Sequence, residues 1–277
     1  MNGLPDNPSY IFAKLCSIAG KTSAEYSLLM PDDRVLAALS GGADSFVLLE
    51  TLLELKRRAP FKFELTAVTF DPGFENFNCE AISSYCRSRQ IEHHVVALDV
   101  PNILSEDLRQ AGRFRRPCVR CSRLRRGKLY GVARELGVNK LALGHHADDL
   151  LESFFISLVR GQGLTTMGPN VPADTRHGDS ASLRIIRPLA MVPEAWVKMA
   201  AGNFDFPVAG ECPYSGELEA SGDRAWAKRE LAEWSKRIPD IRTLMLKSMG
   251  KVELSWLLDK RYLTMDNISG QPEGEKL

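Results

Sequence analysis

Ser40-Gly41-Gly42-Ala43-Asp44-Ser45 joins two strongly apolar segments of the chain. The apolar run before it, residues 35–39, predicts a buried parallel strand, and residues 46–55 predict a largely buried helix. Two glycines between a strand and a helix allow a tight turn whose backbone N–H groups approach an anion, and the helix N-terminus adds partial positive charge there. The stretch therefore predicts an α/β fold with a phosphate-binding loop.

The side chains of this loop indicate how it would bind a phosphate. The hydroxyl groups of Ser40 and Ser45 can donate hydrogen bonds to phosphate oxygens. A carboxylate at Asp44 would repel a phosphate unless Mg²⁺ lies between them, so we expect Mg²⁺ at Asp44. On these six residues alone, an ordinary glycine turn in which Asp44 caps the helix is the alternative.

The same hexapeptide resembles the pyrophosphate loop of the ATP pyrophosphatases that activate a substrate by adenylation. It is not a Walker A loop, because no Gly-Lys-Ser/Thr follows it. The resemblance implies an ATP-binding α/β fold with a doubly wound, mostly parallel sheet of the adenine nucleotide alpha hydrolase type, followed by a helical C-terminal extension. Where the subgroup resembled below often carries Lys, this chain has Ala43, so one cationic phosphate contact is absent or is supplied from elsewhere in the chain.

Composition narrows the class of protein. The chain has 277 residues, of which 44% are hydrophobic and 26% charged, as in globular proteins. The net charge is +1, so the chain as a whole carries no sign of nucleic-acid binding. No apolar run reaches about 18 residues, and residues 1–10 lack a signal-peptide pattern, so we expect a cytoplasmic protein without a membrane span. Six cysteines in such a protein favour a metal or redox site over disulfides.

Further apolar runs predict the rest of the sheet, with strands at residues 63–70, 94–98, 140–143 and 184–187. In open α/β sheets ligands bind at the carboxyl ends of the strands. We therefore expect the adenine to lie against the backbone near Phe70. The motif Gly-His-His-Ala-Asp-Asp at residues 144–149 follows another predicted strand and faces the same edge of the sheet.

Residues 113–128 form a basic segment that contains the pair Cys118 and Cys121. The segment holds eight basic residues in sixteen, and neighbouring cations lower thiol pKa values and keep thiolates available to a metal. One later cysteine, Cys212, lies in a loop-like context and would add a third thiolate. Three thiolates suit a [4Fe–4S] cluster with one iron open to sulfide. Spacing alone leaves zinc or a simple thiol pair equally open.

Two stretches together resemble the tRNA 2-thiocytidine synthetase group. They are Cys-x-x-Cys-Ser-Arg-Leu-Arg-Arg-Gly at residues 118–127 and Leu-Gly-His-His-x-Asp-Asp at residues 143–149. The resemblance covers about residues 34–250, although the group often has a further cysteine where this chain has Ser215. It implies an oxygen-sensitive [4Fe–4S] cluster on Cys118, Cys121 and Cys212, and it implies that Asp149 holds Mg²⁺ or orients the substrate.

The activity implied by the resemblance is ATP-dependent thiolation of a base in tRNA, most closely the formation of 2-thiocytidine. Asp44 and Asp149 would then be the catalytic residues. The implied ATP contacts are Ser40, Gly41, Gly42, Asp44, Ser45, Phe70, Gly144 and His145. The expected RNA contacts are Arg115, Arg116, Arg120, Arg123, Arg125 and Arg126. The expected partners are tRNA and a sulfur donor such as a cysteine desulfurase, and we allow for a homodimer.

Two other functions remain open from the sequence. A relative that adenylates a substrate for attack by an amine, as lysidine synthetase does, would need no cluster. A nucleotide-binding regulatory module could instead hold structural zinc on the three cysteines. In either case we expect a helical segment at residues 1–30, the ATP-binding domain at 31–205, the helical extension at 206–268 and a disordered tail at 269–277.

Replacing any one proposed cluster ligand by alanine should remove most of the iron and all thiolation, because two thiolates hold a cubane poorly. The other three cysteines are Cys16, Cys79 and Cys86. Their alanine variants should retain both the iron and the thiolation activity, and poorer packing should lower the unfolding free energy by about 1 kcal/mol. Iron content and product sulfur are to be measured in all six anaerobically reconstituted variants. Full iron and activity in Cys212→Ala, or their loss in Cys79→Ala, would contradict the assignment.

Overall fold

The computed structural model describes residues 7–103, 117–173, 183–210 and 222–262, with the backbone alone for residues 117–123. The chain forms two compact units, Met1–Arg229 and Glu230–Leu277. The division into four parts that we expect from the sequence stays a prediction.

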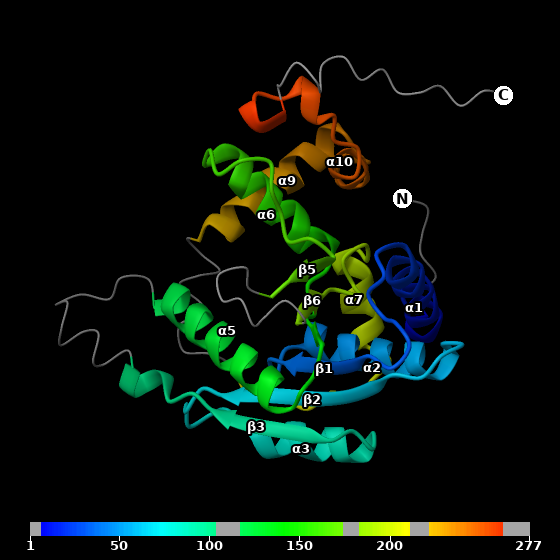
Figure 1. Ribbon diagram of the computed structural model, residues 1–277, viewed down its shortest axis with the longest axis vertical. Helices are drawn as coiled ribbons and strands as arrows, with labels where there is room; N and C mark the ends of the chain where they lie inside the picture. Colours follow the sequence, from blue (N-terminus) through cyan, green and yellow to red (C-terminus); the bar gives the residue numbers. More distant parts are fainter. Residues whose placement is uncertain (1–6, 104–116, 174–182, 211–221, 263–277) are drawn as a thin grey trace. The chain divides into compact units, whose positions relative to one another are not determined.

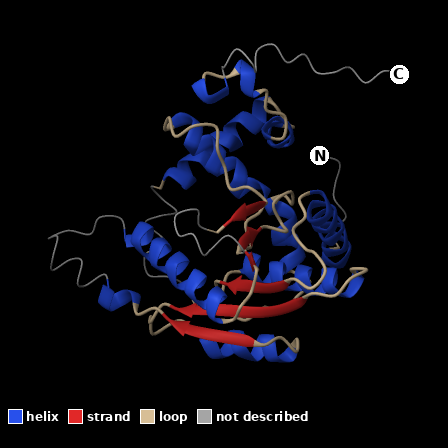
Figure 2. Ribbon diagram, in the orientation of Figure 1, coloured by secondary structure: helices blue, strands red, loops and turns tan. Residues whose placement is uncertain are grey.

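A six-stranded sheet lies at the centre of the first unit (Figures 1 and 2). In chain order the strands are β1 (Arg34–Leu39), β2 (Glu64–Asp71), β3 (His93–Ala97), β4 (Lys140–Ala142), β5 (Asn170–Pro172) and β6 (Arg184–Ile186). Their order across the sheet is β3-β2-β1-β4-β6-β5, and every neighbouring pair is parallel except β5 with β6. The predicted α/β fold with a mostly parallel sheet is confirmed.

Helices cover both faces of this sheet. The longer helices of the first unit are α1 (Pro8–Glu25), α2 (Ala43–Arg58), α3 (Cys79–Ser88), α5 (Pro117–Glu135), α6 (Ala147–Val159), α7 (Glu194–Ala201) and α9 (Asp223–Arg237), the last of which continues into the second unit. Successive strand residues point to opposite faces. Val35 and Ala37 accordingly pack in one core with α1, α2, α3 and α7, whereas Leu36 packs with Leu129 and Ala133 of α5. The sheet is therefore doubly wound.

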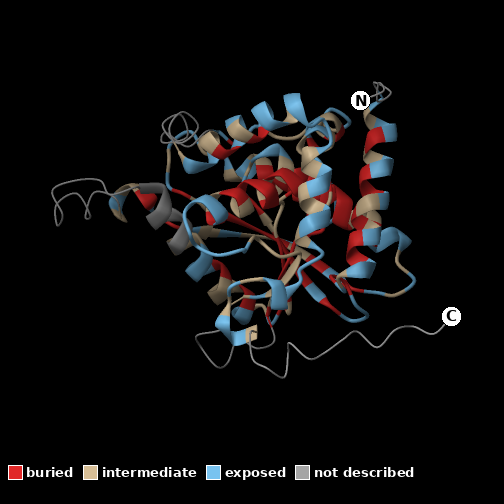
Figure 3. Ribbon diagram, turned by 90° about the horizontal axis from the view of Figure 1, so that it is seen from above, coloured by how far each residue is buried: buried red, intermediate tan, exposed pale blue. Residues whose placement is uncertain are grey.

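The helix after the glycine loop is among the most enclosed parts of the molecule. Phe46, Val47, Leu48 and Leu49 of α2 are fully buried. Figure 3 shows such buried residues gathered on the strands and the central helices, while the outer helices turn exposed faces to solvent. This burial confirms the predicted helix and fixes the position of the loop that precedes it.

The described part of the second unit holds the end of α9 and three further helices. These are α10 (Ile241–Met249) and two short 3-10 helices, η1 (Leu254–Trp256) and η2 (Lys260–Tyr262). Within this unit, the guanidinium of Arg242 donates a hydrogen bond to Ser235 Oγ at 2.9 Å. Across all the residues that the structure describes, no helix is long and apolar enough to cross a membrane.

Two sequence motifs meet where the strand order reverses. The chain runs outward from β1 through β2 to β3 and then returns to β4 on the other side of β1. The loop at residues 40–45 follows β1, and the motif at residues 144–149 follows β4. A Cβ at Gly144 would lie 3.1 Å from the carbonyl oxygen of Asp44 and 3.4 Å from Cα of Ser45. The two motifs therefore touch at the point where ligands bind in doubly wound sheets.

Gly144→Ala should push these two motifs apart, because the atoms it meets belong to the backbone at the start of a buried helix. We expect a decrease in unfolding free energy of about 1–3 kcal/mol, as for other overpacked sites. Gly131→Ala is the matched control, since a Cβ at this helical glycine meets nothing within 4 Å and should stabilise by about 0.5–1 kcal/mol. Urea unfolding of both variants measures the difference, and equal stability of the two would show that the contact at Gly144 is unimportant.

Candidate active site

The loop between β1 and α2 is held by its own serines. Ser45 Oγ donates a hydrogen bond to the Gly42 carbonyl oxygen at 2.7 Å and accepts one from the Ser40 N–H at 3.2 Å. Gly41 has a φ of +87°, in the left-handed region that favours glycine. The buried Ser45 hydroxyl thus shapes the loop, whereas the Ser40 residue is exposed.

The start of α2 provides backbone donors for an anion. The first N–H groups of any helix have no partner within that helix. Gly42 is the N-cap of α2, and no side-chain hydrogen bond caps this helix among the residues that the structure describes. These amide groups and the helix dipole therefore favour a negatively charged ligand at the loop.

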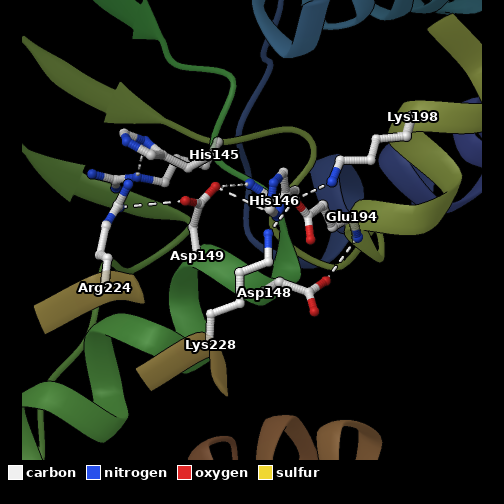
Figure 4. A network of polar contacts seen from close by, with 9 residues as sticks. His145, His146, Asp148, Asp149, Glu194, Lys198, Arg224 and Lys228 are labelled. Carbon is white, nitrogen blue, oxygen red and sulfur yellow. Dashed lines mark hydrogen bonds and ion pairs between the residues drawn. The ribbon is translucent and has the colours of Figure 1, made fainter. Parts of the chain in front are cut away.

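The adjacent acids Asp148 and Asp149 have different contacts (Figure 4). Asp148 Oδ2 accepts a hydrogen bond from the Glu194 N–H at 2.7 Å and so joins α6 to the start of α7. Asp149 Oδ2 accepts one from the His146 N–H at 3.0 Å, and its Oδ1 lies 3.3 Å from the guanidinium of Arg224. Asp148 therefore has a structural contact, while Asp149 lies in a polar network beside the glycine loop.

Asp44 is placed to gain from a bound cation. No hydrogen bond or ion pair joins its carboxylate to any other described residue. Burial raises the pKa of Asp44; Asp149 and Glu194 raise it further, whereas His146 and Lys198 lower it. The charged form of the Asp44 carboxylate is therefore destabilised in this position, and a bound cation would stabilise it. The donor set of Asp44, with Asp149 nearby, fits Mg²⁺, which prefers carboxylate and phosphate oxygens.

His145 and Arg187 form a partly buried pair at the same edge. Arg187 follows β6 and is 6% exposed. Its Nε donates to His145 Nδ1 at 3.3 Å, and another guanidinium nitrogen donates to the Gly168 carbonyl oxygen at 2.5 Å. Burial lowers the pKa of His145 to about 4; Asp149 opposes this shift and Arg187 adds to it. His145 is therefore neutral, and with Nδ1 accepting, its proton is on Nε2, where it can be donated to a ligand.

Helices α7 and α9 add charged side chains that were not among the predicted site residues. Glu194 Oε1 accepts hydrogen bonds from Lys198 Nζ at 2.8 Å and from Lys228 Nζ at 2.7 Å. Burial raises the pKa of Glu194, but these two lysines outweigh it and hold the value at about 2. A signal for Glu194 existed, because it directly follows Pro193 at a helix start. Arg187 similarly stands at the end of a predicted strand.

The paired cysteines belong to the first turns of α5, but their side chains are outside the described part of the structure. The helix begins at Pro117, so it includes both Cys118 and Cys121. One turn further on, Leu124 packs against Leu98 and Val100, which follow β3. Leu124, which follows the cysteine pair in α5, thus lies toward the carboxyl edge of the sheet.

Cys212 lies outside the described residues, but the segment that leads to it adjoins the glycine loop. The Asn78 N–H donates to the Ala209 carbonyl oxygen at 2.8 Å. A Cβ added at Gly41 would lie 2.5 Å from Cβ of Ala209, which is 2% exposed. Residue 209 therefore packs directly beside the phosphate-binding loop.

The three remaining cysteines are neutral thiols. Burial raises the pKa of Cys16 to about 12 and that of Cys86 to about 11. Burial, with Asp71 acting in the same direction, raises the pKa of Cys79 to about 11. Groups that hold their protons this firmly are poor metal ligands, because the thiolate is the form that binds metal.

The basic segment is described in part. Arg115 and Arg116 lie outside the described residues, and so do the side chains of Arg120 and Arg123. Arg126 is exposed, whereas Arg125 is half-buried, and its Nε has no hydrogen-bond partner among the described residues. Phe70, expected beside the adenine, is half-buried near the end of β2.

Comparison with known proteins gives concordant results. The PP-loop domain family matches residues 17–203. A protein of Geobacter sulfurreducens named tRNA-cytidine(32) 2-sulfurtransferase is 37% identical over 90% of this chain and 93% of its own length. A protein of Stutzerimonas stutzeri with the same name is 33% identical over 97% of this chain and 94% of its own length.

A solved structure has the same fold. The U34-tRNA thiolase NcsA from Methanococcus maripaludis, solved with its [4Fe-4S] cluster, superposes with a TM-score of 0.68. The match covers 89% of this chain and 81% of that one at 22% sequence identity, so it is a likeness of fold. The sequence matches show that the chain belongs to the PP-loop family and, within it, to the family of the tRNA-cytidine(32) 2-sulfurtransferases.

Proposed function

We propose that this chain is an ATP-dependent tRNA sulfurtransferase that forms 2-thiocytidine at cytidine 32 of tRNA. The observation that carries the proposal is the contact between Gly144 and the Asp44 backbone, which unites a phosphate-binding loop and a polar motif in one site. Full-length similarity to proteins named for this reaction supports the substrate and the product. A cytoplasmic location is part of the proposal.

The first chemical step is adenylation of the base. The carbonyl oxygen at C2 of the cytosine attacks the α-phosphorus of ATP, a new P–O bond forms, and the bond to pyrophosphate breaks. The amide groups at the start of α2 would stabilise the charge that develops on the leaving pyrophosphate. Asp44 and Asp149 would hold Mg²⁺, which supplies further neutralisation of that charge. His145 can donate from Nε2 to the nucleotide.

The second step replaces the activated oxygen by sulfur. A sulfur nucleophile attacks C2, a C–S bond forms, the C–O bond breaks and AMP leaves. Cys118, Cys121 and Cys212 would hold a [4Fe–4S] cluster, which when bound supplies that sulfur. The donor set fits the cluster, since residues three apart share one face of a helix and a helix N-terminus in general favours the thiolate form.

The RNA contacts are proposed for the basic segment. Sequence-specific RNA recognition prefers unstacked loop bases, and arginines that bind phosphates would hold such a loop near the site. The exposed Arg126 supports this role directly. The remaining arginines of the set, the sulfur donor and a homodimer stay predictions.

The two alternative functions have less support. An amine-ligating relative would need no cysteine ligands, and a regulatory module would need no tRNA. The relatives that align over nearly the whole chain are instead named as tRNA sulfurtransferases. A brown, anaerobically purified protein that absorbs near 400 nm would support the cluster; a colourless zinc protein would favour the regulatory module.

The direct test is the product. Reconstituted protein, ATP, Mg²⁺, sulfide and a tRNA transcript should yield 2-thiocytidine at position 32, detected by mass spectrometry of nuclease digests. A transcript with uridine at position 32 is the matched control and should give no thiolated cytidine. Sulfur at another nucleotide would refute the proposed position, and its absence from all nucleotides would refute the activity.

Asp44→Asn should abolish pyrophosphate release and thiolation, because an amide cannot replace the charge of a carboxylate that binds a metal. The fold and the iron content should be unchanged. Asp32→Asn is a suitable control, since Asp32 is exposed and has a positive φ that asparagine tolerates. Pyrophosphate release is to be measured with a coupled assay, and wild-type release by Asp44→Asn would remove this residue from the mechanism.

Replacing Arg125 and Arg126 by alanine should weaken tRNA binding and reduce its salt dependence, by about one unit of slope for each arginine that binds a phosphate. The single variants separate the two, and the exposed Arg126 should have the larger effect. Lys21→Ala removes an exposed charge from α1 and should leave the slope unchanged. The measurement is the tRNA binding constant at several salt concentrations. An unchanged slope of its logarithm against the logarithm of salt concentration in the double variant would rule out these arginines as phosphate contacts.

A further inference from the structure

We propose that Lys198 supplies the cationic phosphate contact that the loop lacks at Ala43. The inference rests on the proposed function, because it assumes that ATP phosphates occupy the loop. Lys198 lies in α7, far along the chain from the loop, and no local sequence pattern links it to the site.

Helix α7 is fixed to the glycine loop through α6. The Glu194 N–H donates to Asp148 Oδ2 at 2.7 Å, and the Ala147 N–H donates to the Val192 carbonyl oxygen at 2.9 Å. The first turn of α6 is thereby bonded to the first turn of α7. Since Gly144 holds the start of α6 against Asp44, the start of α7 lies at the same edge of the sheet.

The opposite face of α7 is anchored in the core. Val197 and Ala200 are fully buried in the cluster that contains Phe46 and Leu49 of α2. Lys198 projects away from this core, and its side chain is 64% exposed. Its ammonium group folds back by one helical turn to Glu194, toward the N-terminus of α7 and the polar network (Figure 4). A long, exposed side chain on a fixed helix can move its charge without disturbing the fold.

One carboxylate at the site has two ammonium partners. Glu194 is a single carboxylate that binds both Lys198 and Lys228. Lys228 belongs to α9 and interacts electrostatically with Glu194, Glu152 and Asp148. Lys198 belongs instead to α7, whose buried Val197 packs in one cluster with Phe46 at the start of α2. Of these two lysines, Lys198 is therefore the one carried by a helix that packs against the start of α2, directly after the phosphate-binding loop.

Other cations near the site have partners of their own. Arg187 is buried and donates to His145 and Gly168, while Arg224 pairs with Asp149. A lysine binds phosphate as a compact point charge on a flexible stem. When ATP enters, the ammonium group of Lys198 can turn from Glu194 to a phosphate oxygen, and Lys228 continues to neutralise Glu194. Two lysines on one glutamate thus allow one of them to leave.

The test is a rescue experiment with the full-length protein. Lys198→Ala should weaken binding of a non-hydrolysable ATP analogue by about tenfold or more, the range of a hydrogen bond to a charged group. Ala43→Lys introduced into the Lys198→Ala background should restore the affinity, because it returns a cation to the loop itself. Isothermal titration calorimetry measures the analogue without any need for the cluster or tRNA.

Lys21→Ala is the control, since it removes an exposed ammonium group of α1 rather than one bound to Glu194, and it should leave the affinity unchanged. Equal binding by Lys198→Ala and the wild-type protein would overturn the inference while leaving the proposed function intact. Failure of Ala43→Lys to restore binding would overturn it as well. If the wild-type protein binds no ATP analogue, the proposed function itself fails, and the inference fails with it.

Discussion

The close approach of Gly144 to the backbone of Asp44 and Ser45 is the constraint on which the site depends. It exists because a glycine follows β4 at the point where the strand order reverses. Through it, the start of α6 rests on the start of α2, and the hydrogen bonds from α6 extend the arrangement to α7. Polar groups from three helices are thereby held around one phosphate-binding loop.

This packing also sets the charge balance of the site. The acid of the loop, Asp44, has no hydrogen bond or ion pair with another described residue, whereas Asp148, Asp149 and Glu194 are each satisfied by a neighbour. Burial makes the charged form of Asp44 costly, so a cation bound there would be strongly favoured. The proposed Mg²⁺ would relieve this cost and would make the site suited to a metal-bound polyphosphate.

The cysteines divide by electrostatic environment. Cys16, Cys79 and Cys86 are neutral thiols because burial raises their pKa values. The pair at the start of α5 has instead a helix N-terminus and a basic surrounding sequence, both of which favour thiolates. The described residues next to the proposed ligands, Leu124 and Ala209, pack at the carboxyl edge and beside the loop. Cluster chemistry and adenylation could therefore share one edge of the sheet.

Local patterns in the sequence were sufficient for much of this protein. The glycine loop, the buried helix α2 and the approximate positions of the parallel strands follow from apolar runs and turn residues, which act over short distances. The three-residue strand β5 does not follow from them, because its pairing with β6 is not encoded in so short a run. The contact of Gly144 with the loop and the contributions of Arg187, Glu194 and Lys198 were decided by tertiary structure alone. These residues come from separate helices and strand ends, and only the packing of α6 and α7 on the sheet brings their charges together.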